Sequence, residues 1–471
     1  MFDKILIANR GEIAVRIIGT CRRLGIRTVA VFSEADRDSL RVRLADEAHC
    51  IGEPPPAKSY LLQDKIIETA LEAKADAIHP GYGFLSENPD FAAKVRKSGL
   101  AFIGPSAEAI RKLGDKVNAR RLAAKARVPV LPGSGIAVQS VDDARRIASK
   151  IGYPVLIKAS AGGGGKGMRI ARGENELSSS VAAARAESQS AFGRGDIFLE
   201  RFIEHAKHVE IQIVADEHGH CVHFGERECS VQRRHQKIIE ETPSVAVTPR
   251  LRKKMGEAAK KLALHAGYSN AGTVEFILDE KGDFYFLEVN TRLQVEHPLT
   301  ELCNGVDLVE LQLRVAAGEK LKVRQRKIAP AGAAIECRIC AEDPLNDYMP
   351  SLGKIKLLRL PTIPNVRVDT FLYEGCEITP HYDSLLAKII AYGHDRSEAI
   401  RTMRQALDAT TIYGVKTNIG LCRFVLEQKL FVSGEYRTDL LQKVPFTAEH
   451  DAPHAIDTSG LVGSRIYDGT Y

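Results

Sequence analysis

The N-terminal part of the chain alternates short apolar segments with amphipathic ones. KILIAN (residues 4–9) is an apolar run of strand length, and RGEIAVRIIGTCRRLG after it places apolar residues at helical spacing. TVAVFSEAD is a second strand, and the alternation continues through a helix at 64–74, the strand DAIHPG, a helix after Asn88 and the strand AFIG. This pattern predicts a doubly wound, Rossmann-like α/β domain over residues 1–113. Its first turn, Ala8 to Gly11, lacks G-x-G-x-x-G, so we expect no dinucleotide site there.

A second domain is predicted over residues 114–330, beginning with a helix near Asp115. The strand GYPVLIKAS carries Lys158 and leads through four glycines (162–165), Lys166 and Gly167 to the strand MRIA. A flexible linker is one interpretation of the glycines. Their place between two strands favours a mobile lid, within about 131–203, whose backbone N–H groups close over phosphates. The loop is not a Walker A motif, because no Ser or Thr follows Lys166. Strands at 197–203 and 208–216 follow, and backbone groups of the first are suited to holding an adenine.

The segment FYFLEVNTRLQVEHP (residues 284–298) begins as an aromatic, β-branched strand and then turns polar. An extended backbone places alternate side chains on one face. The alternate residues here are all polar: Glu288, Asn290, Arg292, Gln294 and Glu296. One interpretation is an edge strand with a solvated face. The other is a binding site, because isolated buried charges are costly unless they are paired or bind a metal.

A second acid favours the binding site. Glu275 lies upstream across the turn DEKGD, which is typical of a hairpin. A two-residue loop would set Glu275 opposite Glu288, whereas a three-residue loop would shift the register by one. Paired carboxylates with an amide are hard oxygen ligands, suited to Mg²⁺ that carries a nucleotide phosphate.

From about residue 331 to 445 the pattern changes to short strands followed by helices, which predicts a third, α+β domain. Cys337 and Cys340 form a C-x-x-C, but a zinc site needs a second pair, so we interpret both as core or edge residues of a strand. Residues 446–471 are polar and contain Pro and Gly, and we expect a mostly disordered tail there.

Composition narrows the class of protein. A hydrophobic content of 44% and a charged content of 27% are typical of a globular protein without membrane spans. The net charge of +6 is small for 471 residues and fits anionic small molecules better than nucleic acid. The N-terminal apolar run is too short for a signal peptide, and no apolar stretch reaches the length of a membrane span. An odd, scattered set of nine cysteines indicates reduced thiols and a cytoplasmic protein.

Taken together, the motifs closely resemble biotin carboxylase, an ATP-grasp ligase. The resemblance runs in order through IANRGEIAVRI, HPGYGFLSEN, GDKVNAR, IKASAGGGGKGM, RRHQK, EVNTRLQVEHP, ECRICAEDP and HYDSLLAKI, and it leaves out only the tail. It implies a doubly wound N-terminal domain, a central ATP-grasp domain with the glycine-rich lid, and a C-terminal α+β domain.

The resemblance also implies a role for each site residue. For ATP these are Lys116, Lys158, Gly163, Gly164, Gly165, Lys166, Gly167, Met168, Glu200, Arg201, Ile203, His208, Gln232, His235 and Leu278. Glu275, Glu288 and Asn290 would hold Mg²⁺ or Mn²⁺, and bicarbonate would lie against Lys237, Arg292, Gln294, Val295 and Glu296. Glu296 would be the general base, while Tyr82, Gly83 and Arg338 would hold biotin.

No A-M-K-M biotinylation motif occurs in the sequence, so biotin is expected on a separate biotin carboxyl carrier protein, with a carboxyltransferase as a further partner. A homodimer is implied by the family. Two other hypotheses remain open at this point: an ATP-grasp ligase acting on an amine or amino acid, and a non-catalytic ATP-binding scaffold. The acceptor, whether acetyl-CoA, propionyl-CoA or pyruvate, would depend on the carboxyltransferase.

Overall fold

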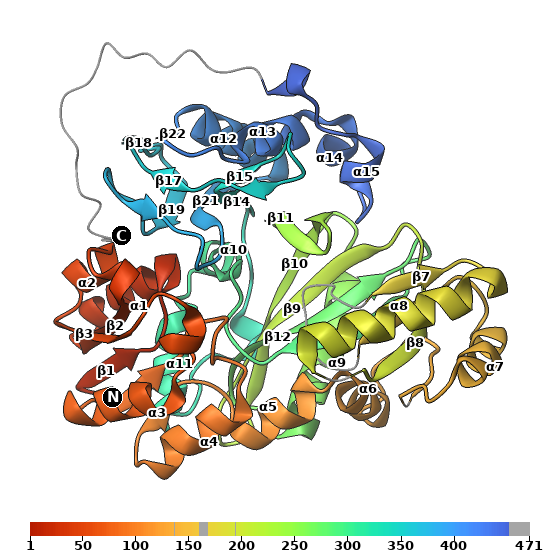
Figure 1. The fold of residues 1–471 in the computed structure, drawn as a ribbon, viewed down its shortest axis with the longest axis horizontal. Helices are drawn as coiled ribbons and strands as arrows, with labels where there is room; N and C mark the ends of the chain where they lie inside the picture. The colour runs from red at the N-terminus through yellow and green to blue at the C-terminus, as the bar shows by residue number, and fades with distance from the viewer. Residues whose placement is uncertain (136, 160–167, 194, 452–471) are drawn as a thin grey trace.

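The computed structural model describes residues 1–135, 137–159, 168–193 and 195–451. Figure 1 shows an N-terminal domain in red and orange, a C-terminal domain in blue, and a large sheet between them in green. A smaller unit with α7 and α8 lies on the other side of that sheet. No helix in the described part of the chain is both long and apolar enough to cross a membrane.

The N-terminal domain is the doubly wound unit that the sequence predicts. Its five parallel strands lie in the order β3-β2-β1-β4-β5. Ile5 and Ile7 of β1 face one hydrophobic core, with α1, and Leu6 faces another, with α3 and α4. Its elements are β1 (Lys4–Ile7), α1 (Gly11–Arg23), β2 (Arg27–Ser33), η1 (Glu34–Asp36), α2 (Leu40–Leu44), β3 (Glu47–Gly52), η2 (Pro56–Lys58), α3 (Gln63–Glu72), β4 (Ala77–His79), α4 (Pro89–Lys97), β5 (Ala101–Phe102) and α5 (Ala107–Gly114).

In the central domain, a helix begins near Asp115 as the sequence predicts, because the Asp115 side chain caps it by accepting from the Asn118 backbone N–H. Three strands of this domain form the smaller unit in the order β7-β6-β8, packed against α7 and α8. Its elements are α6 (Lys116–Lys125), α7 (Val141–Ile151), β6 (Val155–Ala159), β7 (Arg169–Ala171), α8 (Glu174–Phe192), β8 (Ile197–Arg201), β9 (Lys207–Ala215), β10 (Cys221–Arg233), β11 (Gln236–Thr242), α9 (Pro249–Ala266), β12 (Asn270–Leu278), β13 (Phe284–Asn290), α10 (His297–Asn304) and α11 (Leu308–Ala316).

The large sheet does not stop at the boundary between the central and C-terminal domains. It has eight strands in the order β13-β12-β9-β10-β11-β14-β21-β19, and β11 pairs antiparallel with β14. The remaining elements are η3 (Gln325–Lys327), β14 (Ala333–Cys340), β15 (Glu342–Asp343), β16 (Met349–Pro350), β17 (Gly353–Lys354), β18 (Leu357–Arg359), β19 (Val366–Thr370), β20 (Glu377–Ile378), β21 (Leu385–Gly393), α12 (Arg396–Asp408), β22 (Thr411–Tyr413), α13 (Ile419–Glu427), α14 (Lys429–Ser433), α15 (Leu440–Lys443) and η4 (Ala448–His450).

The C-terminal domain tests the predictions made for the two cysteines of the C-x-x-C and for the tail. Cys337 is fully buried in the C-terminal core and Cys340 is partly buried, so both are strand residues as predicted. The first residues that we assigned to the tail still pack on this domain: Phe446 lies against the C-terminal core, and the His450 ring lies 4.2 Å from that of Phe424.

Candidate active site

A cavity of about 1080 Å³ lies where the three domains meet. Its lining includes most of the site residues predicted from the sequence. These are Tyr82, Gly83, Lys116, Lys158, Met168, Glu200, Arg201, Ile203, His208, Gln232, His235, Lys237, Glu275, Glu288, Asn290, Arg292, Gln294, Val295 and Arg338. The predicted lid residues Gly163, Gly164, Gly165, Lys166 and Gly167 lie outside the described residues.

One predicted ATP contact is wrong. Leu278 is buried in the hydrophobic core beside Phe276, whereas its neighbour Ile277 lines the cavity. Successive side chains of a strand point to opposite faces, so Glu275 and Ile277 share the cavity face and Leu278 turns away from it. We therefore assign the apolar contact to Ile277.

The hairpin that joins β12 to β13 resolves the register of the two acids. Asp279 pairs with Asp283 around a three-residue loop, in which Gly282 adopts a φ of 81°. This loop alone would shift the register by one, but a β-bulge at Leu287 restores it, so Glu275 and Glu288 are direct partners. The two acids among the predicted metal ligands therefore meet across one antiparallel pair.

The extended backbone predicted from 288 to 296 ends sooner. Strand β13 stops at Asn290, and Glu296 instead lies at the N-terminus of α10, with Pro298 in the first turn of that helix. The segment in between is irregular, and Glu87 of the N-terminal domain accepts from the Thr291 backbone N–H at 2.9 Å. The prediction that one extended strand places five polar side chains on the same face is therefore wrong. The turn carries Glu296 inward, where it is fully buried.

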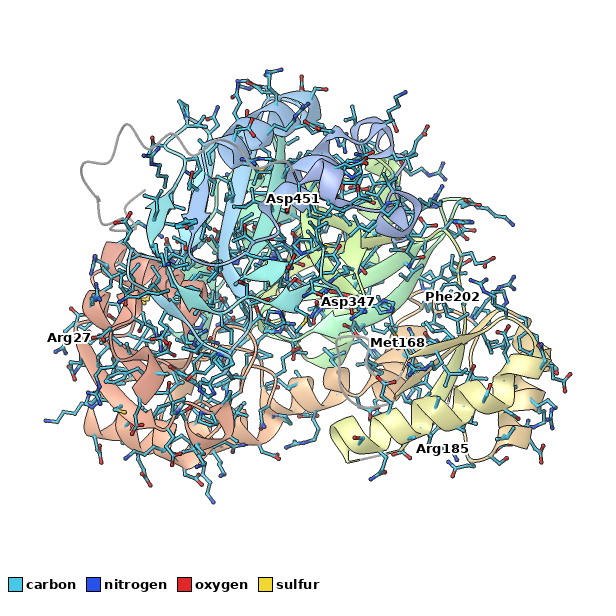
Figure 2. All side chains as sticks on the ribbon, turned by 45° about the horizontal axis from the view of Figure 1, so that its top comes forward. Arg27, Met168, Arg185, Phe202, Asp347 and Asp451 are labelled. Atoms are coloured by element: carbon cyan, nitrogen blue, oxygen red, sulfur yellow. The ribbon has the colours of Figure 1, made fainter. Side chains whose placement is uncertain are left out.

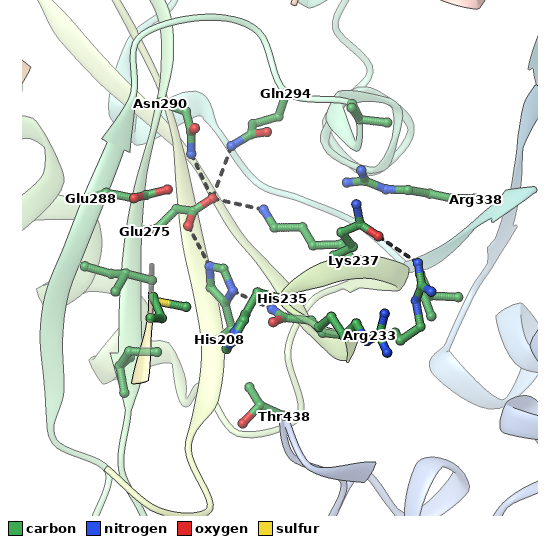
Figure 3. A pocket seen from close by; sticks show the side chains of 18 of the residues that line it. His208, Arg233, His235, Lys237, Glu275, Glu288, Asn290, Gln294, Arg338 and Thr438 are labelled. Carbon is green, nitrogen blue, oxygen red and sulfur yellow. Dashed lines mark hydrogen bonds and ion pairs between the residues drawn. The ribbon is translucent and has the colours of Figure 1, made fainter. Parts of the chain in front are cut away.

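Glu275 lies at the middle of the site (Figure 3). Its Oε1 accepts from Asn290 at 2.8 Å, Lys237 at 3.0 Å and Gln294 at 3.3 Å, and its Oε2 lies 2.9 Å from His208 Nε2. Burial raises the pKa of such a carboxyl, but Lys237 and then His208 hold the pKa of Glu275 well below its usual range. Glu275 is therefore ionised.

Glu288 lies beside Glu275 in a more open position. Lys116 is 3.4 Å from its Oε2, and about a third of the Glu288 side chain, 32%, is exposed. Glu275 and Glu288 offer carboxylate oxygens from two paired strands, and the Asn290 amide lies two residues beyond Glu288 on the same face. This set of ligands fits the oxygen preference of Mg²⁺. His208, Glu210 and Glu275 also bring ligand atoms within 4.8 Å of one another. Glu210 is fully buried, pairs with both Arg227 and Lys237 and does not line the cavity, whereas Glu275 and Glu288 do, so we favour these two as the metal ligands.

Glu296 is fully buried directly behind the deep end of the cavity, where two cations that line the cavity, Lys237 and Arg338, enclose its carboxylate. Lys237 Nζ lies 2.6 Å from Oε1, and Arg338 Nη2 lies 2.8 Å from Oε2. Burial by itself raises the pKa of a carboxyl, but Lys237, Arg338 and Arg227 hold the pKa of Glu296 well below its usual range. Glu296 is therefore ionised, which is the form that a general base needs.

Three acids that the sequence analysis missed hold these cations in place. Glu210 is 2.7 Å from Lys237, Glu240 accepts from Arg338 Nε at 2.6 Å, and Glu87 accepts from Arg292 Nε at 2.9 Å. Glu210 and Glu240 are both fully buried. Glu87 lies within the motif HPGYGFLSEN, and an acid in a Gly-rich loop after a strand is the signal that could have identified it.

Arg292 and Gln294 form the part of the cavity wall between the proposed metal ligands, Glu275 and Glu288, and the N-terminal domain. Arg292 Nη1 donates to Gln294 Oε1 at 3.0 Å, and Nη2 donates to Asn290 Oδ1 at 3.1 Å. The planar fork of an arginine is suited to a planar oxyanion such as bicarbonate. The cavity face here therefore carries both a cationic fork and an amide.

The smaller unit supplies the opposite wall. Lys158 donates to Glu200 at 2.7 Å, and Arg120 pairs with the other oxygen of Glu200. The Arg201 backbone N–H is already bound to Pro132 O at 2.9 Å. Met168 and Phe202, both labelled in Figure 2, add apolar surface to the same part of the lining. An apolar slot beside a lysine suits a nucleotide base and its phosphates.

Three family models match the chain in succession. Residues 1–110 match the biotin carboxylase N-terminal domain, residues 115–324 match the ATP-binding domain of the carbamoyl-phosphate synthase L chain, and residues 336–443 match the biotin carboxylase C-terminal domain.

Individual relatives match over nearly the same length. The chain is 52% identical to a pyruvate carboxylase subunit of Methanothermobacter thermautotrophicus, covering 94% of this chain and 90% of the relative. It is 50% identical to biotin carboxylase of Nostoc sp., covering 94% and 99%. The biotin carboxylase domain of Hydrogenobacter thermophilus 2-oxoglutarate carboxylase, a dimer solved with MgADP, ADP and bicarbonate, superimposes with a TM-score of 0.93 at 48% identity, covering 94% and 98%.

Proposed function

The chain belongs to the biotin carboxylase family, and from this premise we propose how its residues divide the carboxylation of biotin among them. The overall reaction converts ATP, bicarbonate and carrier-linked biotin into ADP, phosphate and carboxybiotin. ATP and Mg²⁺ are the cofactors, and biotin is a substrate carried on another protein. The observation that carries the assignment of roles is Glu296, a buried and ionised carboxylate touching both Lys237 and Arg338.

In the first step, Glu296 removes the proton of bicarbonate held by Lys237, Arg292, Gln294 and the Val295 backbone. The freed oxygen attacks the γ-phosphorus of ATP, the bond to the β-phosphate oxygen breaks, and ADP leaves with carboxyphosphate as the product. Bicarbonate bound beside Lys237 would add a second negative charge near Glu296, and a like charge favours protonation of a carboxylate.

ATP would lie with its phosphates against the side chains of Lys116, Lys158 and His208, near Gln232 and His235, and with its adenine beside Met168, Arg201, Ile203 and Ile277, all of which line the cavity. Glu275, Glu288 and Asn290 would hold Mg²⁺, which offsets charge that develops on the phosphates during transfer.

In the second step, carboxyphosphate releases CO₂ and phosphate, and the phosphate takes the N1′ proton of biotin. The deprotonated N1′ then attacks CO₂, and the new N–C bond gives carboxybiotin. Arg338 stabilises the enolate-like oxygen of the ureido ring, and Tyr82 and Gly83 pack against that ring. Arg338 also touches Glu296, so one guanidinium serves both steps.

We also propose that the enzyme is a cytoplasmic homodimer working with a biotin carboxyl carrier protein and a carboxyltransferase. Its nine cysteines are all free thiols in the described part of the chain, which suits a reducing compartment. Acetyl-CoA is the proposed acceptor of the complex, which would place it in fatty acid biosynthesis. The relationship to a pyruvate carboxylase subunit favours pyruvate as the alternative, and propionyl-CoA is a further one. Co-purification of the carboxyltransferase and assay of its acceptor would decide among them.

The test of this function is bicarbonate-dependent ADP release by the purified chain with Mg²⁺, measured with and without free biotin. We expect release to require bicarbonate and to rise with biotin. Release that needs an amino acid or amine instead of bicarbonate would support the other kind of ATP-grasp ligase. No release from folded protein would support the non-catalytic scaffold.

A further inference from the structure

A buried group of charges reaches from the cavity wall, at Glu12, to Lys388 and Asp369 behind it. Lys388 of β21 is fully buried, and its Nζ donates to Val295 O at 2.9 Å. The same Nζ lies 3.1 Å from Glu12 Oε1 of α1 and 3.4 Å from Asp369 Oδ2 of β19. One ammonium group therefore connects the N-terminal domain, the C-terminal domain and the backbone of the bicarbonate segment.

Glu12 extends this connection to the opposite side of the cavity. Its Oε1 also accepts from the Tyr82 hydroxyl. Its Oε2 has no hydrogen-bond partner among the described residues. The two donors Lys388 and Tyr82 thus supply the hydrogen bonds of a carboxyl group that is 3% exposed, and losing either one is costly in such a place.

The backbone of the loop that bears Tyr82 is held by two hydrogen bonds from the Asn9 side chain. Asn9 donates to Pro80 O at 2.6 Å and to Tyr82 O at 2.7 Å, and Gly81 between them has a φ of 62°. With the backbone fixed in this way, the Tyr82 side chain can move chiefly by changing its contact with Glu12. The continuous path is Tyr82 hydroxyl, Glu12 carboxylate, Lys388 ammonium and Val295 carbonyl.

We propose that Glu12 and Lys388 are positioning residues that couple the biotin end of the cavity, at Tyr82, to the bicarbonate end, at Val295. A ring that packs on Tyr82 changes the hydrogen bond to Glu12, and Lys388 passes that change to the backbone that presents Gln294, Val295 and Glu296. Coupling between two sites is reciprocal in binding free energy and commonly amounts to about 5- to 150-fold. This inference rests on the proposed roles of Tyr82 and Val295.

The experiment measures the ratio of bicarbonate-dependent ADP release with saturating free biotin to release without it, for the full-length chain. Glu12→Gln keeps the shape of the side chain and removes its charge, and we expect the ratio to fall about tenfold. The pair Glu12→Gln with Lys388→Met removes one charge of each sign. Because both residues act in one path, the pair should lower the ratio no further than Glu12→Gln does alone.

Glu241 offers a matched control. It is buried, pairs with one cation, Arg396, at 2.6 Å, and accepts from one tyrosine hydroxyl, that of Tyr436, but it does not line the cavity. Glu241→Gln should leave the ratio unchanged. A merely structural role of Glu12 would make both variants lower the thermal midpoint without a change in the ratio specific to Glu12.

Three results would overturn the coupling. These are a wild-type ratio in Glu12→Gln and in the pair, an equal loss in Glu241→Gln, and wild-type ADP release that biotin does not change. If the Glu12 variants do not fold, Tyr82→Phe removes the hydroxyl alone, and an unchanged ratio there contradicts the proposal. A wild-type chain without any bicarbonate-dependent release would contradict the proposed function instead.

Discussion

The two ends of the cavity treat charge in opposite ways. At the deep end, Lys237 and Glu296 are 2.6 Å apart, with side chains 12% and 0% exposed. At the phosphate end, Lys116 and Glu288 are 3.4 Å apart, with side chains 21% and 32% exposed. The charge of the base Glu296 is therefore balanced by a close contact with Lys237, whereas Lys116 and Glu288 are only loosely associated. Glu275, which touches Lys237 at 3.0 Å and pairs with Glu288 across the hairpin, joins the two ends.

This difference follows from what each end has to bind. A metal needs carboxylate oxygens that it can reach, and the partly exposed Glu288 offers them beside Glu275, which Lys237 and His208 keep ionised. A base in a closed pocket needs cations, because a lone buried carboxylate would take up a proton and lose its function. Preorganised charge at the deep end costs stability only once, during folding, and needs no rearrangement during reaction.

The largest expected effect comes from removing the base. Glu296→Gln keeps the shape of the side chain but cannot accept the bicarbonate proton, so turnover should fall by a factor of order 10²–10⁴. ATP binding should persist, because Lys116 and Lys158 at the other end are untouched. Steady-state ADP release and equilibrium ATP binding, measured on the same preparation, separate the two ends.

Glu241→Gln is the control for this variant, since it also replaces a buried, ion-paired glutamate. Its turnover should stay close to that of the wild type. Normal turnover in Glu296→Gln would show that the deep end does not contain the base.

Much of the phosphate end could be predicted from the sequence, because its residues stand in motifs with distinctive spacing. At the deep end Glu296 was predicted in the same way, but Glu210 and Glu240, the acids that hold the cations around it, could not be. Glu210 stands in HVEIQIVAD, where alternate polar residues are equally typical of a solvated strand face. Only the order of strands, with β9 between β12 and β10, turns that face into an interior. The burial of Glu240 could not be predicted either. It depends on the pairing of β11 with β14, and the sequence pattern assigns these two strands to different domains.

Local geometry explains the other errors. The assignment of Leu278 could have been corrected from the sequence, because strand alternation places Ile277, and not Leu278, on the same face as the predicted ligand Glu275. The bulge at Leu287, which brings Glu275 opposite Glu288, has no sequence signal that could be distinguished from a regular strand. The fold, by contrast, was well predicted, because the alternation of strands and helices is a property of long segments.

A smaller effect is expected at the open end. Glu288→Gln removes a proposed metal ligand, and even the loss of an outer partner of a ligand typically costs about 10–100-fold in metal affinity. The Mg²⁺ concentration for half-maximal ADP release should therefore rise at least about tenfold. Stability should change little, because a partly exposed ion pair such as Lys116–Glu288 contributes about 1 kcal/mol or less.

Titration of Mg²⁺ in the wild type and the variant tests this, with the thermal midpoint as a check on folding. An unchanged Mg²⁺ requirement would contradict the metal assignment. A large drop in thermal stability would contradict the view that this end is only loosely paired.

The smallest effect concerns Glu240, which shows that the deep end is not uniform. Burial raises the pKa of Glu240 to about 7, against the opposing effect of Arg338, while the pKa of Glu296 beside it is held low. A raised pKa means that the folded state binds the proton more tightly than the unfolded state does. The stabilisation is thus complete below the ordinary pKa of 4.5 and is lost as the pH rises through about 7. Glu296 has the opposite sign, and its contribution is lost only in acid, below its usual pKa of 4.5.

The free energy of unfolding of the wild type relative to Glu240→Gln should therefore fall between pH 5 and 7, by at most about 1.4 kcal/mol per pH unit. Urea unfolding of both proteins at pH 5, 6 and 7 measures it, and the other titrating groups cancel to first order in the difference. Parallel curves would mean that Glu240 is ionised throughout, with its charge fully balanced by Arg338. All acids of the deep end would then be ionised and paired with cations. The difference between them and the loosely paired Glu288 at the open end would be larger than the raised pKa of Glu240 indicates.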